Sequence, residues 1–329
     1  MQAVITGATG LVGANLAEAL LAAGHDVRAT RRKTSRMEHV SDLDVEWVET
    51  DLADVEGLTR AFDGADAVFH CAAAVTVRDV PPPWVITANV EGTGNVLRAV
   101  RDAGAGRLVY CSSTVAVGIS EDGEVCDEES PWNLRAHGLD DGYATTKYQA
   151  ELLVRGMAAE GMDLVIVNPG FMFGPRDVRP SSGELIVNVA RGTVPGHTPG
   201  VNNFVDVRDV CRGMIAAWEK GRAGERYILG HRNMSYRAIF ETIAEVAGVR
   251  APTIAVPEWA SVFVGWGGDA YQWLTDRDAP VNSATVRWAY CGGFKFSSDK
   301  ARAELGYDPG PIEPAIADAI AWFKARGML

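Results

Sequence analysis

The first 24 residues constrain the fold more than any other segment. They contain a short apolar stretch, a turn with Gly7, Gly10 and Gly13 at three-residue spacing, and a helical pattern that ends at Gly24. Glycine lets such a turn adopt positive φ and lets a phosphate approach the backbone, while the helix N-terminus stabilises the phosphate charge. Because the turn joins the first strand to the first helix, it predicts a dinucleotide site rather than a glycine-rich turn that binds nothing.

Short apolar runs then alternate with helical patterns over the first two thirds of the chain. This alternation predicts an α/β fold, with a doubly wound parallel sheet of the Rossmann type. After Pro169, long loops rich in Gly, Pro and Ser replace the short connections. We therefore expect a dinucleotide-binding Rossmann domain over 1–169, to which 204–231 returns, and a smaller, discontinuous substrate-binding region over 170–203 and 232–329.

Composition argues against several classes of protein. The 329 residues include 31 basic and 43 acidic side chains, for a net charge of −12, and the basic residues are scattered. This pattern does not favour binding to nucleic acid or to an anionic membrane. The five cysteines show no C-x-x-C spacing, which predicts free thiols in a cytoplasmic protein and no metal site. No signal peptide is recognisable, and no apolar run is long enough to span a membrane.

The segment 256–274 comes nearest to a membrane-associated pattern. It is rich in Trp and aliphatic residues, but Glu258, Gly268 and Asp269 interrupt it. We expect a helix that packs against the body or lines a substrate pocket, with a membrane-surface helix as the alternative.

The end of the second strand predicts which nucleotide binds. In NAD sites this strand normally ends in an acidic residue that binds the ribose hydroxyls. Here it ends in Thr30, Arg31, Arg32 and Lys33, and guanidinium groups suit a 2′-phosphate. We therefore expect NADP(H) to be preferred and NAD(H) to be possible, although a merely solvated basic loop would have the same sequence. Asp51, after the third strand, could accept a hydrogen bond from the adenine amino group or could cap a helix.

Tyr143 and Lys147 lie four residues apart, so one helical turn brings the ammonium near the phenol. Tyrosine with its usual pKa of about 10 is a poor acid or base at neutral pH, and a neighbouring positive charge lowers that pKa. Thirty residues before Tyr143, Ser112 and Ser113 end an apolar strand, at the sheet edge where ligands of open α/β sheets bind. These residues predict carbonyl chemistry: Ser113 hydrogen-bonds a carbonyl, Tyr143 gives it a proton and a nicotinamide gives it hydride. The alternative is a strand-end serine and a surface tyrosine without a joint role.

In this order and spacing, the glycine turn, Ser113 and the Tyr143/Lys147 pair resemble the extended short-chain dehydrogenase/reductase family, also called NAD-dependent epimerase/dehydratases. The likeness covers essentially the whole chain and includes the secondary motifs FHCAAAV (69–75), NVEGTGNVL (89–97), DEESPW (127–132), NPGFMFGP (168–175) and FVDVRDV (204–210). It is closest to dihydroflavonol 4-reductase-like enzymes and to the group named hopanoid-associated sugar epimerases.

The resemblance implies residue roles beyond those argued above. Tyr143 would be the general acid/base, Lys147 would lower its pKa and bind the nicotinamide ribose, and Ser113 would polarise the carbonyl. Asn89 resembles the family's helix asparagine, although a cap or packing role suits it equally. The expected cofactor-binding set is Gly7, Thr9, Gly10, Leu11, Val12, Gly13, Arg31, Arg32, Asp51, Leu52, Cys71, Ala72, Ala73, Tyr143, Lys147 and Pro169. The family also implies a homodimer, here through helices near 86–103 and 143–160.

Departures from the sugar-nucleotide branch favour a reductase. Dehydratases of the family carry Asp-Glu after the Ser/Thr pair, whereas Val115 and Ala116 follow here. We therefore expect an NADP-dependent oxidoreductase that reduces a ketone or aldehyde on a fairly large apolar or aromatic small molecule. The expected substrate contacts are Ser113, Phe171 and Met172, with further apolar surface from Phe173 and 259–273.

Two other functions are compatible with the sequence. An NAD-dependent nucleotide-sugar epimerase would need a diphosphate clamp, which Arg176, Arg179 and Arg191 could supply. A nucleotide-sensing binding protein would keep the fold without turnover, but it would have no use for the proton relay of Ser113, Tyr143 and Lys147.

Overall fold

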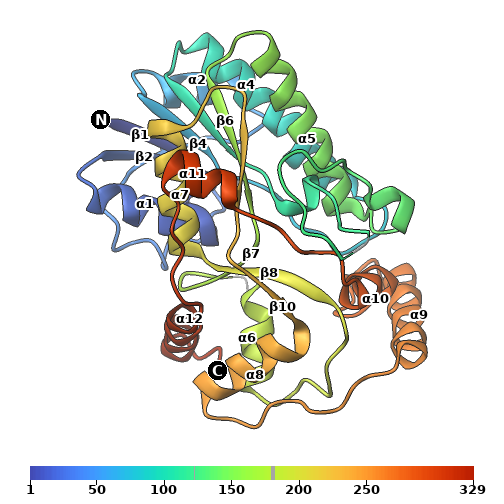
Figure 1. The fold of residues 1–329 in the computed structure, drawn as a ribbon. Coiled ribbons are helices and arrows are strands. Elements are labelled where there is room, and N and C mark those ends of the chain that lie inside the picture. Colours follow the sequence, from blue (N-terminus) through green and yellow to red (C-terminus); the bar gives the residue numbers. More distant parts are fainter. Residues whose placement is uncertain (122, 179–181) are drawn as a thin grey trace.

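A seven-stranded parallel sheet forms the centre of the computed structural model, which describes residues 1–121, 123–178 and 182–329 (Figure 1). The strand order is β3-β2-β1-β4-β5-β6-β9, and every neighbouring pair is parallel. This order reverses direction between β1 and β4, as in doubly wound folds, so the predicted fold class is confirmed. The strands are β1 (Gln2–Thr6), β2 (Asp26–Arg31), β3 (Glu46–Glu49), β4 (Ala67–His70), β5 (Arg107–Cys111), β6 (Leu164–Pro169) and β9 (Arg226–Leu229).

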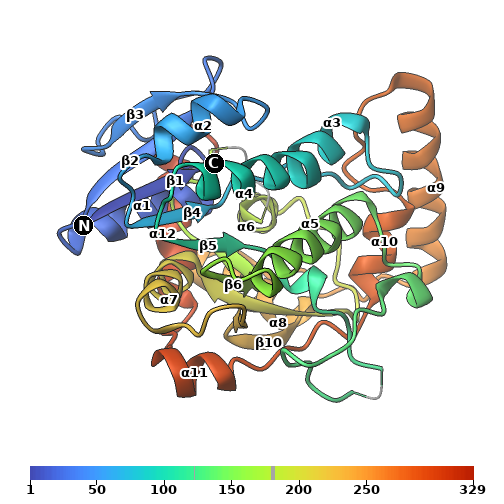
Figure 2. The same ribbon diagram turned by 90° about the horizontal axis from the view of Figure 1, so that it is seen from above.

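Helices cover both faces of this sheet (Figure 2). One layer contains α1 (Leu11–Ala22), α7 (Val207–Lys220) and α11 (Asp299–Leu305), and the other contains α2 (Val55–Phe62), α4 (Gly92–Asp102) and α5 (Gly142–Ala159). Successive side chains of a strand point to opposite faces. Accordingly, Ala3 and Ile5 of β1 pack into the α1 layer, whereas Val4 packs into the α2 layer. Shorter elements lie between these strands and helices: α3 (Pro83–Ile86) and the π-helical turn Thr87–Glu91 lead into α4, and the 3-10 turns Thr114–Ala116 and Leu134–His137 lie between β5 and α5.

A separate unit, called the second layer below, consists of a small sheet with three helices and begins directly at the carboxyl end of β6. There β7 (Phe171–Phe173) pairs with β8 (Val201–Asp206), and β8 pairs with β10 (Arg232–Ser235) in a three-stranded sheet. Three helices pack on it, α6 (Gly183–Ala190), α8 (Tyr236–Ala247) and α12 (Glu313–Ala325) (Figure 1). Phe173 is fully buried here and stacks on Phe204 with ring centroids 5.6 Å apart. The expectation that Phe173 lines a pocket is therefore wrong, because its ring belongs to this hydrophobic core.

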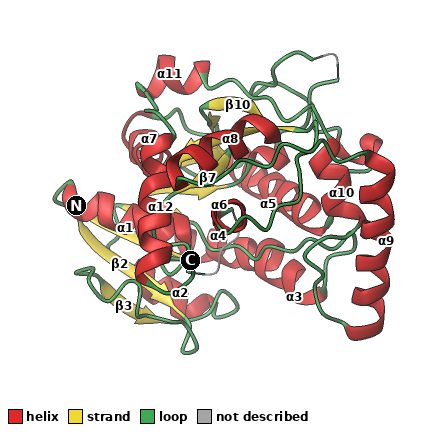
Figure 3. Cartoon of the chain, turned by 90° about the horizontal axis from the view of Figure 1, so that it is seen from below, coloured by secondary structure: helices red, strands yellow, loops and turns green. Residues whose placement is uncertain are grey.

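Helices α9 (Glu258–Thr275) and α10 (Ser283–Tyr290) pack together as a hairpin at one side of the molecule (Figure 3). Four aromatic side chains of α9 are largely exposed, so this face of the helix does not pack against the body. Trp259, Phe263, Trp266 and Trp273 are between 58% and 84% exposed. Among the described helices, none is long and apolar enough to cross a membrane.

Candidate active site

The three glycines of the first turn have different structural roles. Gly7 has φ +78°, and a Cβ there would lie 2.6 Å from the backbone nitrogen of Ala72. A Cβ on Gly13 would collide with the carbonyl oxygen of Gly7, so α1 could not pack this closely against the turn. Gly10 is the N-cap of α1 and has room around it. The first N–H groups of α1, which have no carbonyl partner within the helix, are left to face a ligand, and this arrangement fits a dinucleotide pyrophosphate.

The loop after β2 is held against this turn by contacts that no local sequence pattern indicates. The ring of His39, which is buried, contacts the carbonyl oxygen of Thr9 at 2.9 Å through Nε2. Arg176 in turn donates to the carbonyl oxygen of His39 at 2.7 Å and pairs with Glu18 and Asp42. Its guanidinium lowers the pKa of Asp42 to about 2. These contacts hold the wall on which the adenosine half of a dinucleotide would lie.

The same contacts bear on the diphosphate clamp that an epimerase would need. Arg176 is engaged by two carboxylates, and Arg191 donates to the carbonyl oxygen of Met328 at 2.9 Å. Arg179 lies outside the described residues. Two of the three candidate arginines therefore already have other partners.

The residues expected at the adenosine end are exposed or half-buried. Arg31 forms an ion pair with Glu49, in which Nη2 and Oε2 are 3.4 Å apart. Arg32 is exposed, and its backbone N–H donates to the Ser35 hydroxyl at 3.0 Å. Asp51 accepts a hydrogen bond from the backbone N–H of Ala53 at 3.0 Å. It does not cap α2, because Asp54 occupies the N-cap position and accepts from Gly57 at 2.9 Å. The cap alternative for Asp51 is therefore wrong.

Tyr143 and Lys147 lie in the first turns of α5, which begins after its N-cap residue Asp141. Lys147 is 2% exposed, and its Nζ donates to the Tyr110 hydroxyl at 3.1 Å and to the Cys111 carbonyl at 2.8 Å. These bonds tie α5 to the carboxyl end of β5. Ser113 follows that strand as the N-cap of a 3-10 turn. The three predicted catalytic residues therefore come together at the carboxyl edge of the sheet.

The environment of Tyr143 shifts its pKa in two directions. Burial raises the pKa of the phenol above its usual value, while the charge of Lys147 and a hydrogen bond with Ser113 lower it. Burial is the larger effect in the free protein, so the phenol keeps its proton at neutral pH. A protonated phenol beside a serine hydroxyl can donate to a carbonyl oxygen that gains negative charge.

Next to this group, His70 has a structural role. Burial and the charge of Lys147 lower the pKa of His70 to about 3, so its ring is neutral. Its Nδ1 lies 2.7 Å from the Thr6 hydroxyl and its Nε2 lies 3.0 Å from the Thr93 hydroxyl. The ring thereby joins β4 to β1 and to α4 and leaves Cys71, Ala72 and Ala73 at the sheet edge.

Asn89 lies in the π-helical turn before α4 and connects two walls of the site. Its Oδ1 accepts from the backbone N–H of Ala74 at 2.7 Å, and its Nδ2 donates to the Ala74 carbonyl at 2.8 Å and the Thr146 hydroxyl at 3.0 Å. Such π-helical turns often occur at functional sites. Asn89 holds the loop after β4 against α5, one residue from Lys147.

Comparison with known proteins agrees with this geometry. The model of the NAD dependent epimerase/dehydratase family matches residues 3–230. The chain belongs to this family. The "Putative dihydroflavonol 4-reductase" of Synechocystis sp. is 36% identical over 328 residues, which cover 98% of this chain and 94% of the relative. "Sterol demethylase protein B" of Methylococcus capsulatus is 34% identical over 332 residues, with complete coverage of both chains.

A solved structure with the same architecture is that of gox2253, which superimposes with a TM-score of 0.85 at 35% identity and covers 99% of each chain. The predicted resemblance is thus confirmed. This member of the epimerase/dehydratase family is an NAD(P)-dependent oxidoreductase of the extended short-chain dehydrogenase/reductase type.

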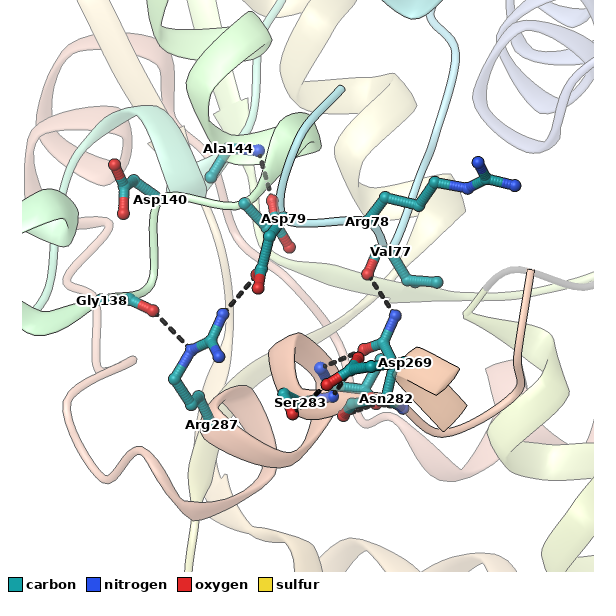
Figure 4. Close-up of polar contacts among 12 residues, drawn as sticks. Val77, Arg78, Asp79, Gly138, Asp140, Ala144, Asp269, Asn282, Ser283 and Arg287 are labelled. Atoms are coloured by element: carbon teal, nitrogen blue, oxygen red, sulfur yellow. Dashed lines mark hydrogen bonds and ion pairs between the residues drawn. The ribbon is translucent and has the colours of Figure 1, made fainter. Parts of the chain in front are cut away.

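Beyond the end of β6, Phe171 and Met172 of β7 are half-buried and are separated from Pro169 by Gly170 alone. The α9–α10 hairpin makes polar contacts with the loops before α5 (Figure 4). Arg287 donates to the Gly138 carbonyl at 2.6 Å and pairs with Asp79, while Asn282 donates to the Val77 carbonyl at 2.6 Å. These contacts were not predicted, because each joins residues more than a hundred positions apart.

Proposed function

We propose that this enzyme is an NADP-dependent reductase that converts a ketone or aldehyde to an alcohol on a relatively large apolar or aromatic substrate. The observation that carries the proposal is the position of Lys147. Its ammonium is buried, held by the Tyr110 hydroxyl and the Cys111 carbonyl, and one helical turn from Tyr143. Burying a cation contributes little to stability, whereas a cation held beside a half-buried phenol and a serine hydroxyl can promote proton transfer from that phenol.

The glycine turn of Gly7, Gly10 and Gly13 would hold a nicotinamide dinucleotide, which would supply hydride to a carbonyl carbon when bound. Ser113 donates a hydrogen bond to the carbonyl oxygen, and Tyr143 transfers its phenolic proton to that oxygen as the alcohol forms. Lys147 stabilises the phenolate until a proton returns from solvent. Hydride and proton together account for the two hydrogens that the carbonyl gains.

We assign the cofactor preference to Arg31 and Arg32. Arg32 is exposed, and Arg31 forms an ion pair of 3.4 Å with Glu49. A 2′-phosphate would therefore compete with the Glu49 carboxylate for the Arg31 guanidinium. Fluorescence titration of nucleotide-free protein should show that NADPH binds at least about tenfold more tightly than NADH, or about 1.4 kcal/mol. Arg32→Ala should reduce this ratio, and Glu49→Gln should increase it. Equal affinity for the two nucleotides would overturn the assignment.

The substrate class is proposed from two features. Phe171 and Met172 present half-buried apolar surface near Pro169, and the names of the relatives refer to a dihydroflavonol and a sterol, both polycyclic. We assign substrate binding to the regions 170–203 and 232–329, which supply the second layer and the α9–α10 hairpin.

Turnover tests the reaction directly. The purified enzyme would be incubated with NADPH and a panel of flavanone-type and steroidal ketones, and NADPH consumption and alcohol formation would be measured together. We expect stoichiometric net reduction, and Tyr143→Phe should abolish it while cofactor affinity stays unchanged. Tightly bound NAD with interconversion of nucleotide sugars and no net redox change would favour the epimerase instead.

We also propose that the enzyme is a homodimer through α4 and α5. Leu152 and Leu153 on α5 are 46% and 43% exposed. With Leu97 and Met157 they border a shallow cavity of about 300 Å³ between the two helices. Sedimentation velocity should give a dimer for the wild type and a monomer for Leu153→Glu, and a monomeric wild type would refute the proposal.

A further inference from the structure

A third polar residue, Glu151, shares the inner face of α5 with the Tyr143/Lys147 pair. It follows Lys147 by four residues and Tyr143 by eight, so the three side chains form one stripe along the helix. Glu151 is 2% exposed. A carboxylate at that depth costs considerable free energy unless it is paired and hydrogen-bonded.

Three donors from different elements surround this carboxylate. Its Oε2 accepts from the Ser112 hydroxyl at 2.5 Å and from Asn168 Nδ2 at 2.8 Å. Its Oε1 accepts from Arg226 Nη1 at 3.2 Å. Hydrogen bonds to an ionised group are shorter and stronger than those between neutral groups. Glu151 therefore joins α5 to the ends of β5 and β6 and to the start of β9.

The contacts of Asn168 lead from Glu151 to Ser113. The same Nδ2 that donates to Glu151 also donates to the Ser113 carbonyl at 3.0 Å, so both protons of the amide are used. Turning the amide over would place its Oδ1 against the carboxylate of Glu151, which would be repulsive. The charge of Glu151 thus determines which way the Asn168 amide points, and that amide holds the main chain of Ser113.

A second route from Glu151 to Ser113 runs through the chain itself. Ser112, whose hydroxyl binds Glu151, directly precedes Ser113, and its backbone N–H donates to the Val167 carbonyl at 2.8 Å. Ser113 is therefore held on both sides: by its own carbonyl through Asn168 and by the preceding residue through Glu151. Beyond this point the chain leaves the sheet and turns into the 3-10 segment Thr114–Ala116.

An apolar side chain could fill this space at a lower desolvation cost, so stability alone does not account for the buried ion pair of Glu151 with Arg226. We propose that Glu151 is a positioning residue: it fixes the backbone of Ser112 and Ser113 so that the Ser113 hydroxyl faces the substrate carbonyl. The inference rests on the proposed role of Ser113 in carbonyl polarisation. Displacing a positioned group by about 1 Å can cost about 100-fold in rate.

The test is a double-mutant cycle with Ser113. Glu151→Gln keeps the size of the side chain but presents an NH₂ group to donors, and it should lower kcat at least about tenfold while the Kd for NADPH changes less than about twofold. In the Ser113→Ala background, the same substitution should lower kcat less than about twofold further, since there is no hydroxyl left to position. Equal losses in both backgrounds, or no loss in either, would overturn the proposal. The exposed Glu219, on α7, provides the matched control as Glu219→Gln.

Two additions make every outcome informative. If Glu151→Gln does not fold, Asn168→Ala replaces it in the cycle under the same expectations, because it removes the link to Ser113 and leaves the Glu151–Arg226 pair intact. If the wild type reduces no carbonyl, the proposed function fails, and a crystal structure of Glu151→Gln still tests positioning. A displaced Ser113 supports the inference, and an unchanged Ser113 rejects it.

Discussion

Helices α5 and α9 are both 18 residues long, and both depart from the usual division between polar surface and apolar interior, in opposite directions. On α5, polar side chains are buried, and Leu152 and Leu153 are exposed. On α9, only Gly265 is buried, and the residues exposed to solvent are largely aromatic. The buried polar residues of α5 are Thr146, Lys147 and Glu151, and the exposed apolar residues of α9 are Trp259, Phe263, Val264, Trp266, Tyr271, Trp273 and Leu274.

The difference shows that hydrogen-bond partners, rather than hydropathy, determine which face of each helix turns inward. Lys147 and Glu151 of α5 reach donors and acceptors on β5, β6 and β9. Asp269 of α9 likewise turns inward, where it accepts from the backbone N–H and the hydroxyl of Ser283. The two helices therefore share an inner face that carries hydrogen-bonded polar side chains. They differ in what that face does, because only the polar stripe of α5 reaches the catalytic edge of the sheet.

Replacing the central residue of the α5 stripe should have the largest effect. Lys147→Met keeps the length of the side chain but leaves the Tyr110 hydroxyl and the Cys111 carbonyl without their donor, and Tyr143 loses its neighbouring charge. We expect kcat/KM to fall roughly 10²- to 10⁴-fold and the free energy of unfolding to fall by about 1–3 kcal/mol. Steady-state kinetics and urea unfolding measure the two quantities. Arg155→Met, at an exposed position of the same helix, should change neither, and near-normal turnover of Lys147→Met would contradict the mechanism.

The sequence predicts the α5 half of this comparison well, because its signals are local. Strand and helix periodicity indicates the doubly wound sheet, and the four-residue spacing of Tyr143 and Lys147 places them on one face of a helix. Glu151 continues that spacing and could have been found in the same way. Its partners Ser112, Asn168 and Arg226 lie 39, 17 and 75 residues away, and no local pattern contains them.

The α9 half is predicted poorly for a related reason. An aromatic-rich helix is usually buried, so the sequence favours packing or a pocket. The rotation of α9 about its axis depends on Asp269 and Gln272 meeting the start of α10, and these contacts appear only in the folded chain. The sequence likewise favours a pocket position for Phe173, because it does not reveal that Phe204 stacks against this ring.

A glycine pair in α9 tests whether its inner face is as closely packed as that of α5. A Cβ on Gly268 would collide with the carbonyl oxygen of Val281, whereas a Cβ on the adjacent Gly267 meets no atom within 4 Å. We expect Gly268→Ala to lower the free energy of unfolding by about 1–3 kcal/mol through displacement of α10. Gly267→Ala should instead raise it by about 0.5–1 kcal/mol, because alanine favours the helix. Equal effects of the two substitutions, measured by urea unfolding, would show that the two helices do not pack closely.

The N-cap of α5 should make stability depend on pH. Burial raises the pKa of Asp141 to about 6 from its usual 3.8. Between these values the folded protein holds a proton that the unfolded chain has lost, so this carboxyl makes the free energy of unfolding fall as pH rises from about 4 to 6. Asp141→Asn keeps a capping side chain and cannot titrate.

The two proteins should therefore be compared by urea unfolding at several pH values. The stability of Asp141→Asn relative to wild type should increase by on the order of 1 kcal/mol across this pH range and stay constant above it. A difference that is flat from pH 4 to 6 would show that Asp141 titrates normally.

The smallest effect is expected on the outer face of α9. Trp273 is 84% exposed, so Trp273→Gln removes almost no buried surface and should change the free energy of unfolding by less than about 0.5 kcal/mol. Trp218 is 7% exposed and packs edge-on against Phe69, and Trp218→Gln should cost about 3–5 kcal/mol. If Trp273→Gln were as costly as Trp218→Gln in urea unfolding, the outer face of α9 would be covered in solution. The contrast between the two helices would then reduce to the polar stripe of α5 alone.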